Sequence, residues 1–148
     1  PHNIYGPAMG FEHVIPEIIK KIFLASKKLK EKKIKIKIQG SGKETRSFCY
    51  VNDAAEGIYI LAKKGKNNEI YNLGKNEEIN IVNLVKKISN ILNLEVKIIK
   101  KPLTKGSTLR RVPDIKKIRK IGYNPKTNLI NGLKETINWY IDYYNKNV

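Results

Sequence analysis

Residues 39–53 read QGSGKETRSFCYVND and combine strand, turn and helix signals in one short span. Just before them, isoleucine and lysine alternate over 34–38, the period of a β-strand with one buried face. The glycines then form a turn, and 47–51 has the composition of a second strand. Asp53, followed three residues later by a glutamate, is a capping box for a helix near 54–64. The sequence therefore predicts a strand–turn–strand–helix unit here.

Elements of both kinds continue on either side of this unit. The opening segment 1–7 has glycine and proline without periodicity, which indicates a loop, and the polar segment 100–112 indicates another. Apolar spacing predicts helices over about 15–31, from Asn80 to about 92, from Pro113 to Gly122 and over about 129–146, and strands at 70–73 and 96–99. Mixed helix and strand periods without an internal repeat indicate the α/β class.

The length of 148 residues fits one domain, and 41% hydrophobic residues allow a core. A single cysteine, Cys49, cannot form an internal disulfide, which suits a reducing compartment. It falls in a predicted buried strand, so we expect a core thiol rather than a nucleophile. No signal peptide and no apolar run of about 20 residues is visible. We therefore expect a cytoplasmic chain without a membrane partner.

The formal net charge of +17 suggests nucleic acid as one possible partner. However, almost all of the positive charge is lysine, spread along the whole chain together with abundant isoleucine and asparagine. This pattern indicates a compositional bias with a solvated lysine-rich surface, so we expect nucleic acid not to be the partner. Such a charge still attracts any polyanion, including a sugar nucleotide.

Several common site motifs are absent from the sequence. No glycine-rich dinucleotide loop follows a predicted strand, residues 40–43 lack P-loop spacing, and no pair of histidines or cysteines has metal-ligand spacing. The motifs therefore predict neither a metal site nor a dinucleotide site in this chain.

Four motifs follow one another along the chain: HNIYGP (2–7) with HVIP (13–16); QGSG through TRSF to YVND (39–53); YNLG (71–74); and RVPD (111–114), GYNP (122–125), GL (132–133) and WY (139–140). Their order and spacing resemble the extended short-chain dehydrogenase/reductase family, which includes NAD-dependent nucleotide-sugar epimerases, dehydratases and decarboxylases. The second motif is similar to the family pattern G-x-G-x-x-x-R-x-F-x-Y-V-x-D. The resemblance covers essentially the entire chain.

The resemblance implies a bilobed enzyme in which an N-terminal Rossmann lobe holds NAD or NADP and a Tyr-x-x-x-Lys pair. We expect this chain to start after that pair, without the N-terminal half. Residues 1–148 are then a single substrate-binding region, the C-terminal lobe plus the last strand–helix unit of the Rossmann fold, with 46–73 contributing to the Rossmann sheet. The chain alone is expected to bind no cofactor, to hold no catalytic residue and to be inactive. Its expected partners are a nucleotide-diphosphate sugar and either an N-terminal Rossmann half or a homo-oligomer partner.

Two arginines match family phosphate positions, Arg46 and Arg111. A diphosphate favours the planar, bidentate guanidinium. Arginine is rare in this lysine-rich chain, occurring only at Arg46, Arg110, Arg111 and Arg119, so its use at these positions indicates a need for that geometry. A surface arginine or a structural ion pair is the alternative, and Arg110 could exchange roles with Arg111.

The remaining expected contacts also follow from the resemblance, and each has a structural alternative. The substrate contacts are Asn3, His13, Val14, Lys37, Ile38, Gln39, Asn80 and Asp114, and His2 lies where the family chain passes the nicotinamide. Asn3 could instead form an Asx-turn, and His13 could be a surface residue at a helix start. Residues 37–39 could simply form an edge strand, whereas Asn80 and Asp114 could cap helices. An acid/base role for His2 is disfavoured, because the resemblance gives that role to a tyrosine.

The leading hypothesis is thus the nucleotide-sugar lobe of an NAD-dependent epimerase, dehydratase or decarboxylase. In the complete enzyme, hydride transfer to NAD would precede epimerisation, dehydration or decarboxylation. One alternative is a free-standing module that binds a nucleotide sugar or docks on a partner without activity. A basic nucleic-acid-binding protein is the third possibility.

Overall fold

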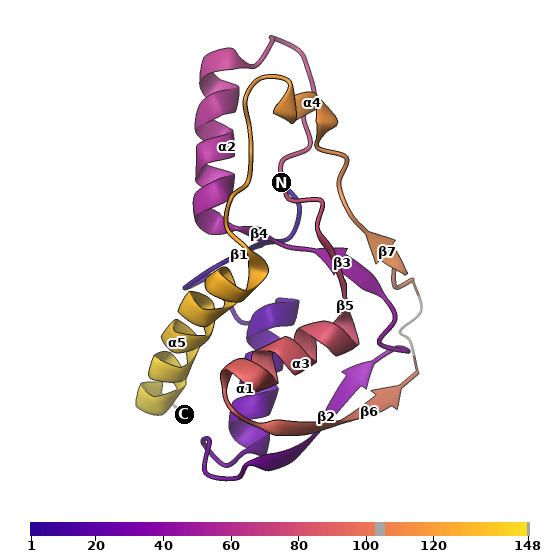
Figure 1. Cartoon of the computed structure of the whole chain (residues 1–148), viewed down its shortest axis with the longest axis vertical. Coiled ribbons are helices and arrows are strands. Elements are labelled where there is room, and N and C mark those ends of the chain that lie inside the picture. Colours follow the sequence, from indigo (N-terminus) through magenta and orange to yellow (C-terminus); the bar gives the residue numbers. More distant parts are fainter. Residues whose placement is uncertain (103–105, 148) are drawn as a thin grey trace.

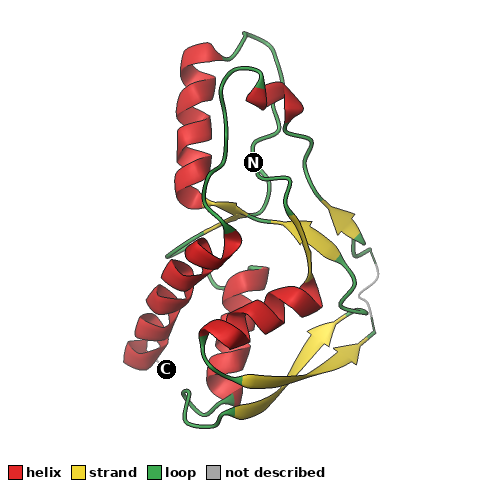
Figure 2. Cartoon of the chain, viewed as in Figure 1, coloured by secondary structure: helices red, strands yellow, loops and turns green. Residues whose placement is uncertain are grey.

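The computed structural model describes residues 1–102 and 106–147 and confirms the α/β class. Helix α2 and the strand pair β2–β6 lie toward opposite ends of an elongated molecule (Figures 1 and 2). In chain order the elements are β1 (Ile4–Tyr5), α1 (Val14–Ala25), β2 (Lys33–Gln39), β3 (Thr45–Ser47), β4 (Cys49–Tyr50), α2 (Val51–Lys64), β5 (Glu78–Asn80), α3 (Ile81–Ile91), β6 (Glu95–Lys101), β7 (Arg110–Arg111), α4 (Lys116–Arg119) and α5 (Leu129–Asn147).

The described strands form three small sheets. β1 pairs with β4 in parallel, and β2 pairs with β6 in parallel over the full length of both strands. In the third sheet β3 is central, antiparallel to β5 on one side and parallel to β7 on the other. Within the described residues the second edge of β2 pairs with no strand.

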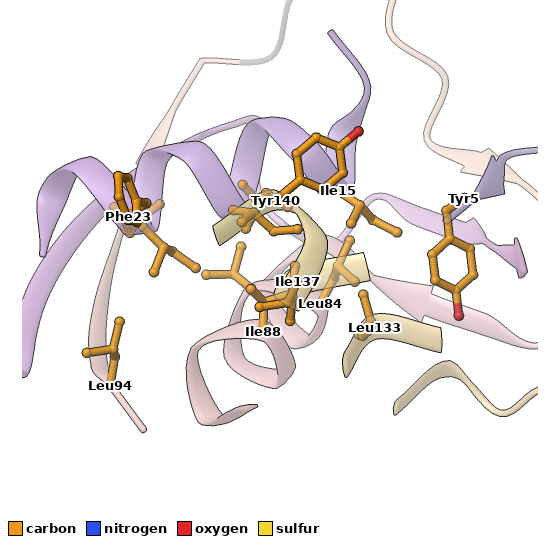
Figure 3. Close-up of a cluster of buried hydrophobic side chains, with 14 of the residues drawn as sticks. Tyr5, Ile15, Phe23, Leu84, Ile88, Leu94, Leu133, Ile137 and Tyr140 are labelled. Carbon is orange, nitrogen blue, oxygen red and sulfur yellow. The ribbon is translucent and has the colours of Figure 1, made fainter. Parts of the chain in front are cut away.

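The larger hydrophobic core lies between α1, α3, α5 and the inner face of β2 (Figure 3). Ile22 of α1, Ile88 of α3 and Ile137 of α5 are each fully buried. The predicted alternation in β2 is confirmed, because its three isoleucines face this core while its lysines are exposed. Each such aliphatic side chain contributes about 1.5–3 kcal/mol on burial, so the four elements stabilise one another.

A smaller core lies around the start of α2 and includes Cys49, Leu73, Ile118 and Tyr123. The Tyr123 hydroxyl donates to the Gly74 carbonyl (2.9 Å) and lies 3.4 Å from Cys49 Sγ. Cys49 is fully buried, and burial raises the pKa of its thiol, which confirms the expected core thiol.

Helix α1 ends at Ala25, so the prediction of a helix to residue 31 is wrong in its last part. The Ser26 hydroxyl donates to the Ile22 carbonyl (2.7 Å), and residues 27–29 all take positive φ values (47°, 60° and 69°). Left-handed residues cannot continue a right-handed helix. Leu29 still packs against the larger core, but it does so from this turn, which is why its spacing fitted a helix.

The predicted strand at 47–51 is divided, and the predicted capping box is wrong. β3 ends at Ser47, β4 covers Cys49–Tyr50, and α2 already begins at Val51. Asp53 therefore lies inside α2, where it is buried and accepts hydrogen bonds from the backbone N–H groups of Lys126 (3.1 Å) and Thr127 (3.0 Å). Its carboxylate binds a distant loop instead of capping its own helix.

The predicted strand at 70–73 is also wrong, because these residues form no ladder. They are tied to the chain start by one backbone hydrogen bond, from His2 N–H to the Leu73 carbonyl (2.8 Å). The short strands β1, β5 and β7 were not predicted, since two or three residues are too few to show strand alternation. Residues 103–105 of the predicted 100–112 loop lie outside the described residues. The predicted helix starting after Asn80 is confirmed, with the Asn80 side chain accepting from Asn83 N–H (2.8 Å).

Candidate functional site

Two of the candidate phosphate ligands lie side by side on neighbouring strands. β3 and β7 pair in parallel, and Arg46 is directly opposite Arg111. Residues in register on adjacent strands project from the same face of the sheet. Arg46 is half-buried and Arg111 is exposed. Two positive side chains that are far apart in sequence therefore share one face of this sheet.

The Arg46 guanidinium is oriented by backbone carbonyls. Its Nη1 donates to the Thr45 carbonyl and its Nη2 to the Thr108 carbonyl, each at 2.7 Å. The pKa of Arg46 is lowered, first by burial and second by the positive charge of Arg111, whereas Glu44 acts in the opposite direction. The pair is thus a site where positive charge is concentrated and only partly compensated.

Arg110 does not compete for this position. Its guanidinium makes a fork with the Glu78 carboxylate, through Nε to Oε1 (3.1 Å) and Nη2 to Oε2 (3.0 Å). Within residues 1–102 and 106–147, Arg111 makes no side-chain hydrogen bond or ion pair. Of the two neighbours, Arg111 is therefore the one whose donors are available to a ligand.

A cavity of about 150 Å³ lies between α1 and β2, next to Arg46. It is called the α1–β2 cavity below. Five of the residues predicted from the sequence line it: Val14, Lys37, Ile38, Gln39 and Arg46. The rest of its lining is Glu17, Ile18, Lys21, Ile36, Glu44, Ile81 and Ser107. Apolar walls with a few charged groups are typical of small-ligand sites.

The end of β2 offers backbone groups as well as side chains to this cavity. Lys37 and Gln39 are exposed, whereas Ile38 points into the larger core and is 5% exposed. Because one edge of β2 is unpaired among the described strands, backbone N–H and C=O groups of this segment are free to bind a ligand. The alternative of an edge strand is therefore compatible with a binding role.

Asn3 and His13 lie outside the cavity lining. The Asn3 side-chain amide donates to the Ser47 carbonyl (2.9 Å), which joins the chain start to the end of β3. Asn3 has φ of 42°, a left-handed conformation that asparagine tolerates. His13 is the exposed N-cap residue of α1, and its side chain makes no capping hydrogen bond.

Three other candidates are also separate from the cavity. Asn80 caps α3 and lines a different hollow of about 480 Å³, together with Glu78 and Lys86. Asp114 is exposed and accepts from Lys116 N–H (2.9 Å) just before α4, but the N-cap residue of that helix is Ile115, so the capping alternative is wrong. His2 is half-buried. The structure thus brings together Val14, residues 37–39 and Arg46 around the cavity. The candidates outside its lining are Asn3, His13, Asn80, Asp114 and His2.

Glu44 is a cavity residue that the sequence did not reveal. It is 5% exposed, and its carboxylate accepts from the N–H groups of Ser41 (2.9 Å) and Gly42 (2.7 Å) and from the Ser41 hydroxyl (3.0 Å). Burial alone would raise the pKa of Glu44, but these hydrogen bonds outweigh it and lower the pKa. An acid two residues after a Gly-x-Gly turn was the available signal.

The fold matches solved structures of sugar-nucleotide enzymes. The structure of dTDP-glucose 4,6-dehydratase from Streptomyces venezuelae with NAD and TYD bound has 27% sequence identity and a TM-score of 0.80, over 98% of this chain and 43% of that one. UDP-glucose 4-epimerase from Thermotoga maritima, solved with UDP-glucose, has 24% identity and a TM-score of 0.84, over 97% of this chain and 45% of that one. The fold is therefore that of the extended short-chain dehydrogenases/reductases.

Sequence comparison gives the family. A model of the NAD dependent epimerase/dehydratase family matches residues 1–74, which is half of the 148 residues. The chain belongs to that family, as the four motifs predicted. It is 34% identical to human dTDP-D-glucose 4,6-dehydratase over 145 residues and 28% identical to probable GDP-L-fucose synthase 1 of Oryza sativa subsp. japonica over 146 residues. It covers 39% and 44% of those two proteins, so it spans about two fifths of their length.

Two further properties concern metals and membranes. In the part of the chain that the structure describes, no group of three or more histidine, cysteine, aspartate or glutamate side chains could hold a metal ion. None of the described helices is long and apolar enough to cross a membrane.

Proposed function

We propose that this chain binds a nucleotide-diphosphate sugar as the C-terminal part of an NAD- or NADP-dependent epimerase, dehydratase or decarboxylase. The observation that carries the proposal is the register of Arg46 with Arg111 beside the α1–β2 cavity. Family membership and the UDP-glucose present in the Thermotoga maritima epimerase structure support the same ligand class.

The arginine pair suits a diphosphate for an electrostatic reason. Two guanidinium groups on one face repel each other, and the pKa of Arg46 is lowered mainly by burial and secondly by that repulsion. A diphosphate between them would replace repulsion with charge-assisted, bidentate hydrogen bonds. Arg46 is already oriented by two carbonyl contacts, so it loses less conformational freedom on binding.

The α1–β2 cavity is the proposed place for the nucleoside portion. Val14 and Ile18 provide apolar contact, and the unpaired edge of β2 provides backbone donors and acceptors. A cavity of about 150 Å³ holds only part of a nucleotide, so the rest of the ligand would extend past Arg46. The ligand would then lie along the end of β2 and the face formed by β3 and β7.

The cofactor does not fit the residues present. A dinucleotide site needs a strand, a glycine-rich turn and a helix N-terminus in sequence, and the sequence has no such loop. We therefore assign no step through NAD to this chain, and His2 stays a candidate neighbour of a cofactor held elsewhere. The isolated chain is expected to convert no sugar nucleotide.

A partner lobe is part of the proposal. Helix α2 exposes Val51 (39%), Ile58 (57%) and Tyr59 (59%), which are spaced along one face of the helix. β1 and β4 have only two residues each, and parallel strands are normally covered on both faces. We propose that an N-terminal Rossmann half covers this α2 face and extends the β1–β4 sheet.

Calorimetric titration with UDP-glucose and dTDP-glucose tests the site. Arg46→Lys and Arg111→Lys each replace a planar fork with a single ammonium group, so each should weaken binding by about 1–3 kcal/mol. Arg119→Lys on α4 is the matched control, because Arg119 is exposed and does not line the α1–β2 cavity. Unchanged affinity in both test variants, or equal losses in the control, would contradict the site assignment. The same titrations repeated with the N-terminal half present would show whether the partner lobe adds to binding.

A further inference from the structure

The outer face of the β2–β6 sheet concentrates positive charge. Parallel register places Lys33 opposite Glu95 and Lys35 opposite Lys97. The first pair is an ion pair at 3.3 Å, but the second places two lysines in register on neighbouring strands. Like charges in that relation destabilise a sheet. This face therefore carries an unfavourable charge arrangement that a bound anion would relieve.

A hollow of about 380 Å³ lies on the unpaired edge of β2, between that strand and α1. Its lining includes Lys21 from α1, Lys35 and Lys37 from β2, and Lys101 from β6, and none of the described lining residues is a carboxylate. Lys21 pairs with Glu17. Within residues 1–102 and 106–147 the other three lysines make no ion pair. The hollow thus has at least three uncompensated positive charges beside free backbone N–H groups.

We propose that this hollow is an anion subsite that binds a phosphate group of a small phosphorylated molecule. Lysine acts as a point charge for phosphate, and the edge of a sheet is itself an anion-binding concavity. The lining residues that the structure describes include no aromatic side chain, so they offer no surface for stacking nucleic-acid bases. Its volume accommodates a phosphate group rather than a duplex.

The subsite adjoins the α1–β2 cavity and shares part of its lining. The shared residues are Lys21, Ile36, Lys37, Ile38 and Gln39, whereas Ala25, Lys35 and Lys101 line only the subsite. The proposal rests on these lysines and not on the proposed sugar-nucleotide function. A ligand with a second phosphorylated group could occupy both places at once.

Titration with sodium pyrophosphate at constant ionic strength tests the subsite. The titration is made in an Arg46→Gln/Arg111→Gln chain, so that the arginine pair cannot contribute. Saturable binding is expected in this chain, and adding Lys35→Gln/Lys101→Gln should weaken it by roughly tenfold or more. Circular dichroism of each variant checks that the fold is retained.

A matched control separates the subsite from net charge. Lys64→Gln/Lys134→Gln removes the same two charges from exposed positions on α2 and α5, away from the β2–β6 sheet (Figure 1), and should leave affinity unchanged. The charge-retaining Lys35→Arg/Lys101→Arg variant should retain binding even where the glutamine variant folds poorly. Absence of saturable binding, equal losses in both glutamine pairs, or displacement of pyrophosphate by short duplex DNA would each overturn the proposal. Pyrophosphate binding together with unchanged UDP-glucose affinity in the arginine variants would instead overturn only the proposed function.

Discussion

Replacing Gly132 with alanine tests how closely α5 packs on the chain start. A Cβ atom at this position would lie 2.2 Å from the Tyr5 hydroxyl oxygen, 2.8 Å from Tyr50 Cδ2 and 2.9 Å from Tyr5 Cζ. Neither ring can easily move, because Tyr5 is 1% exposed and packs edge-on against Tyr50 at 5.5 Å between centroids. All three contacts are shorter than those that real Cβ atoms make. The steric cost should therefore be near the upper end of the roughly 1–3 kcal/mol that is typical of overpacking.

Helix propensity works in the opposite direction. Alanine is favoured over glycine inside a helix by about 1 kcal/mol. The two effects leave a net destabilisation of about 2 kcal/mol, which corresponds to a fall in Tm of roughly 4–8 °C for a chain of this size.

Urea denaturation followed by circular dichroism measures this effect. Asn131→Ala is the control, because Asn131 is exposed in the same turn of α5 and should be neutral or slightly stabilising. Tyr5→Phe in the Gly132→Ala background removes the nearest oxygen and should recover part of the loss, which a double-mutant cycle would reveal. A Gly132→Ala chain as stable as Asn131→Ala would refute the packing argument.

Three further outcomes are expected. Asn80→Ala should lower the free energy of unfolding measured in urea by about 1 kcal/mol, because it removes the side chain that caps α3. Asn83→Ala is the control and should cause no such loss, because Asn83 contributes only its backbone N–H to the cap. Equal losses would contradict this. The pKa of Glu44 is lower in the folded state, so its ionised form stabilises the protein at pH values above the ordinary glutamate pKa of about 4.3, and this stability is lost as the pH falls through the lower folded-state pKa. Glu44→Gln should therefore flatten the low-pH part of a profile of Tm against pH. An unchanged profile would argue against this role of Glu44. Sedimentation velocity should show self-association of the isolated chain that Ile58→Gln/Tyr59→Gln reduces, and a compact monomer before substitution would count against the α2 docking face.

Sequence reasoning was most successful where apolar residues recur regularly along a whole helix or strand. The alternation in β2, the stripe of α5 and the cap at Asn80 follow from local rules and are confirmed. The end of α1 was not predictable, because Leu29 has helical spacing but packs from a left-handed turn. Asp53 was misassigned for a similar reason, since its hydrogen-bonding partners are more than 70 residues away in the sequence.

For the candidate site, the sequence supplied residues but not their arrangement. The resemblance identified Arg46 and Arg111, and only the pairing of β3 with β7 placed them on one face. For Glu44 the only local signal is its place two residues after a Gly-x-Gly turn, and its burial depends on that turn closing back on its carboxylate. Asn80 caps α3, and Asp114 makes a local bond to Lys116 N–H, so both have structural roles without a ligand.

The bond between Asp53 and the loop at Lys126–Thr127 also constrains the order in which the chain can fold during synthesis. Helix α2 leaves the ribosome long before those backbone N–H groups are made, and the smaller core additionally requires Ile118 and Tyr123. Until residues 126 and 127 have been made, the Asp53 carboxylate lacks these two partners and is hydrated instead. The larger core likewise awaits α5, because Ile137 and Tyr140 complete it. Both cores therefore close only after residues 118–140 have emerged, so the isoleucine-rich faces of β2 and α1 stay exposed on the nascent chain until then.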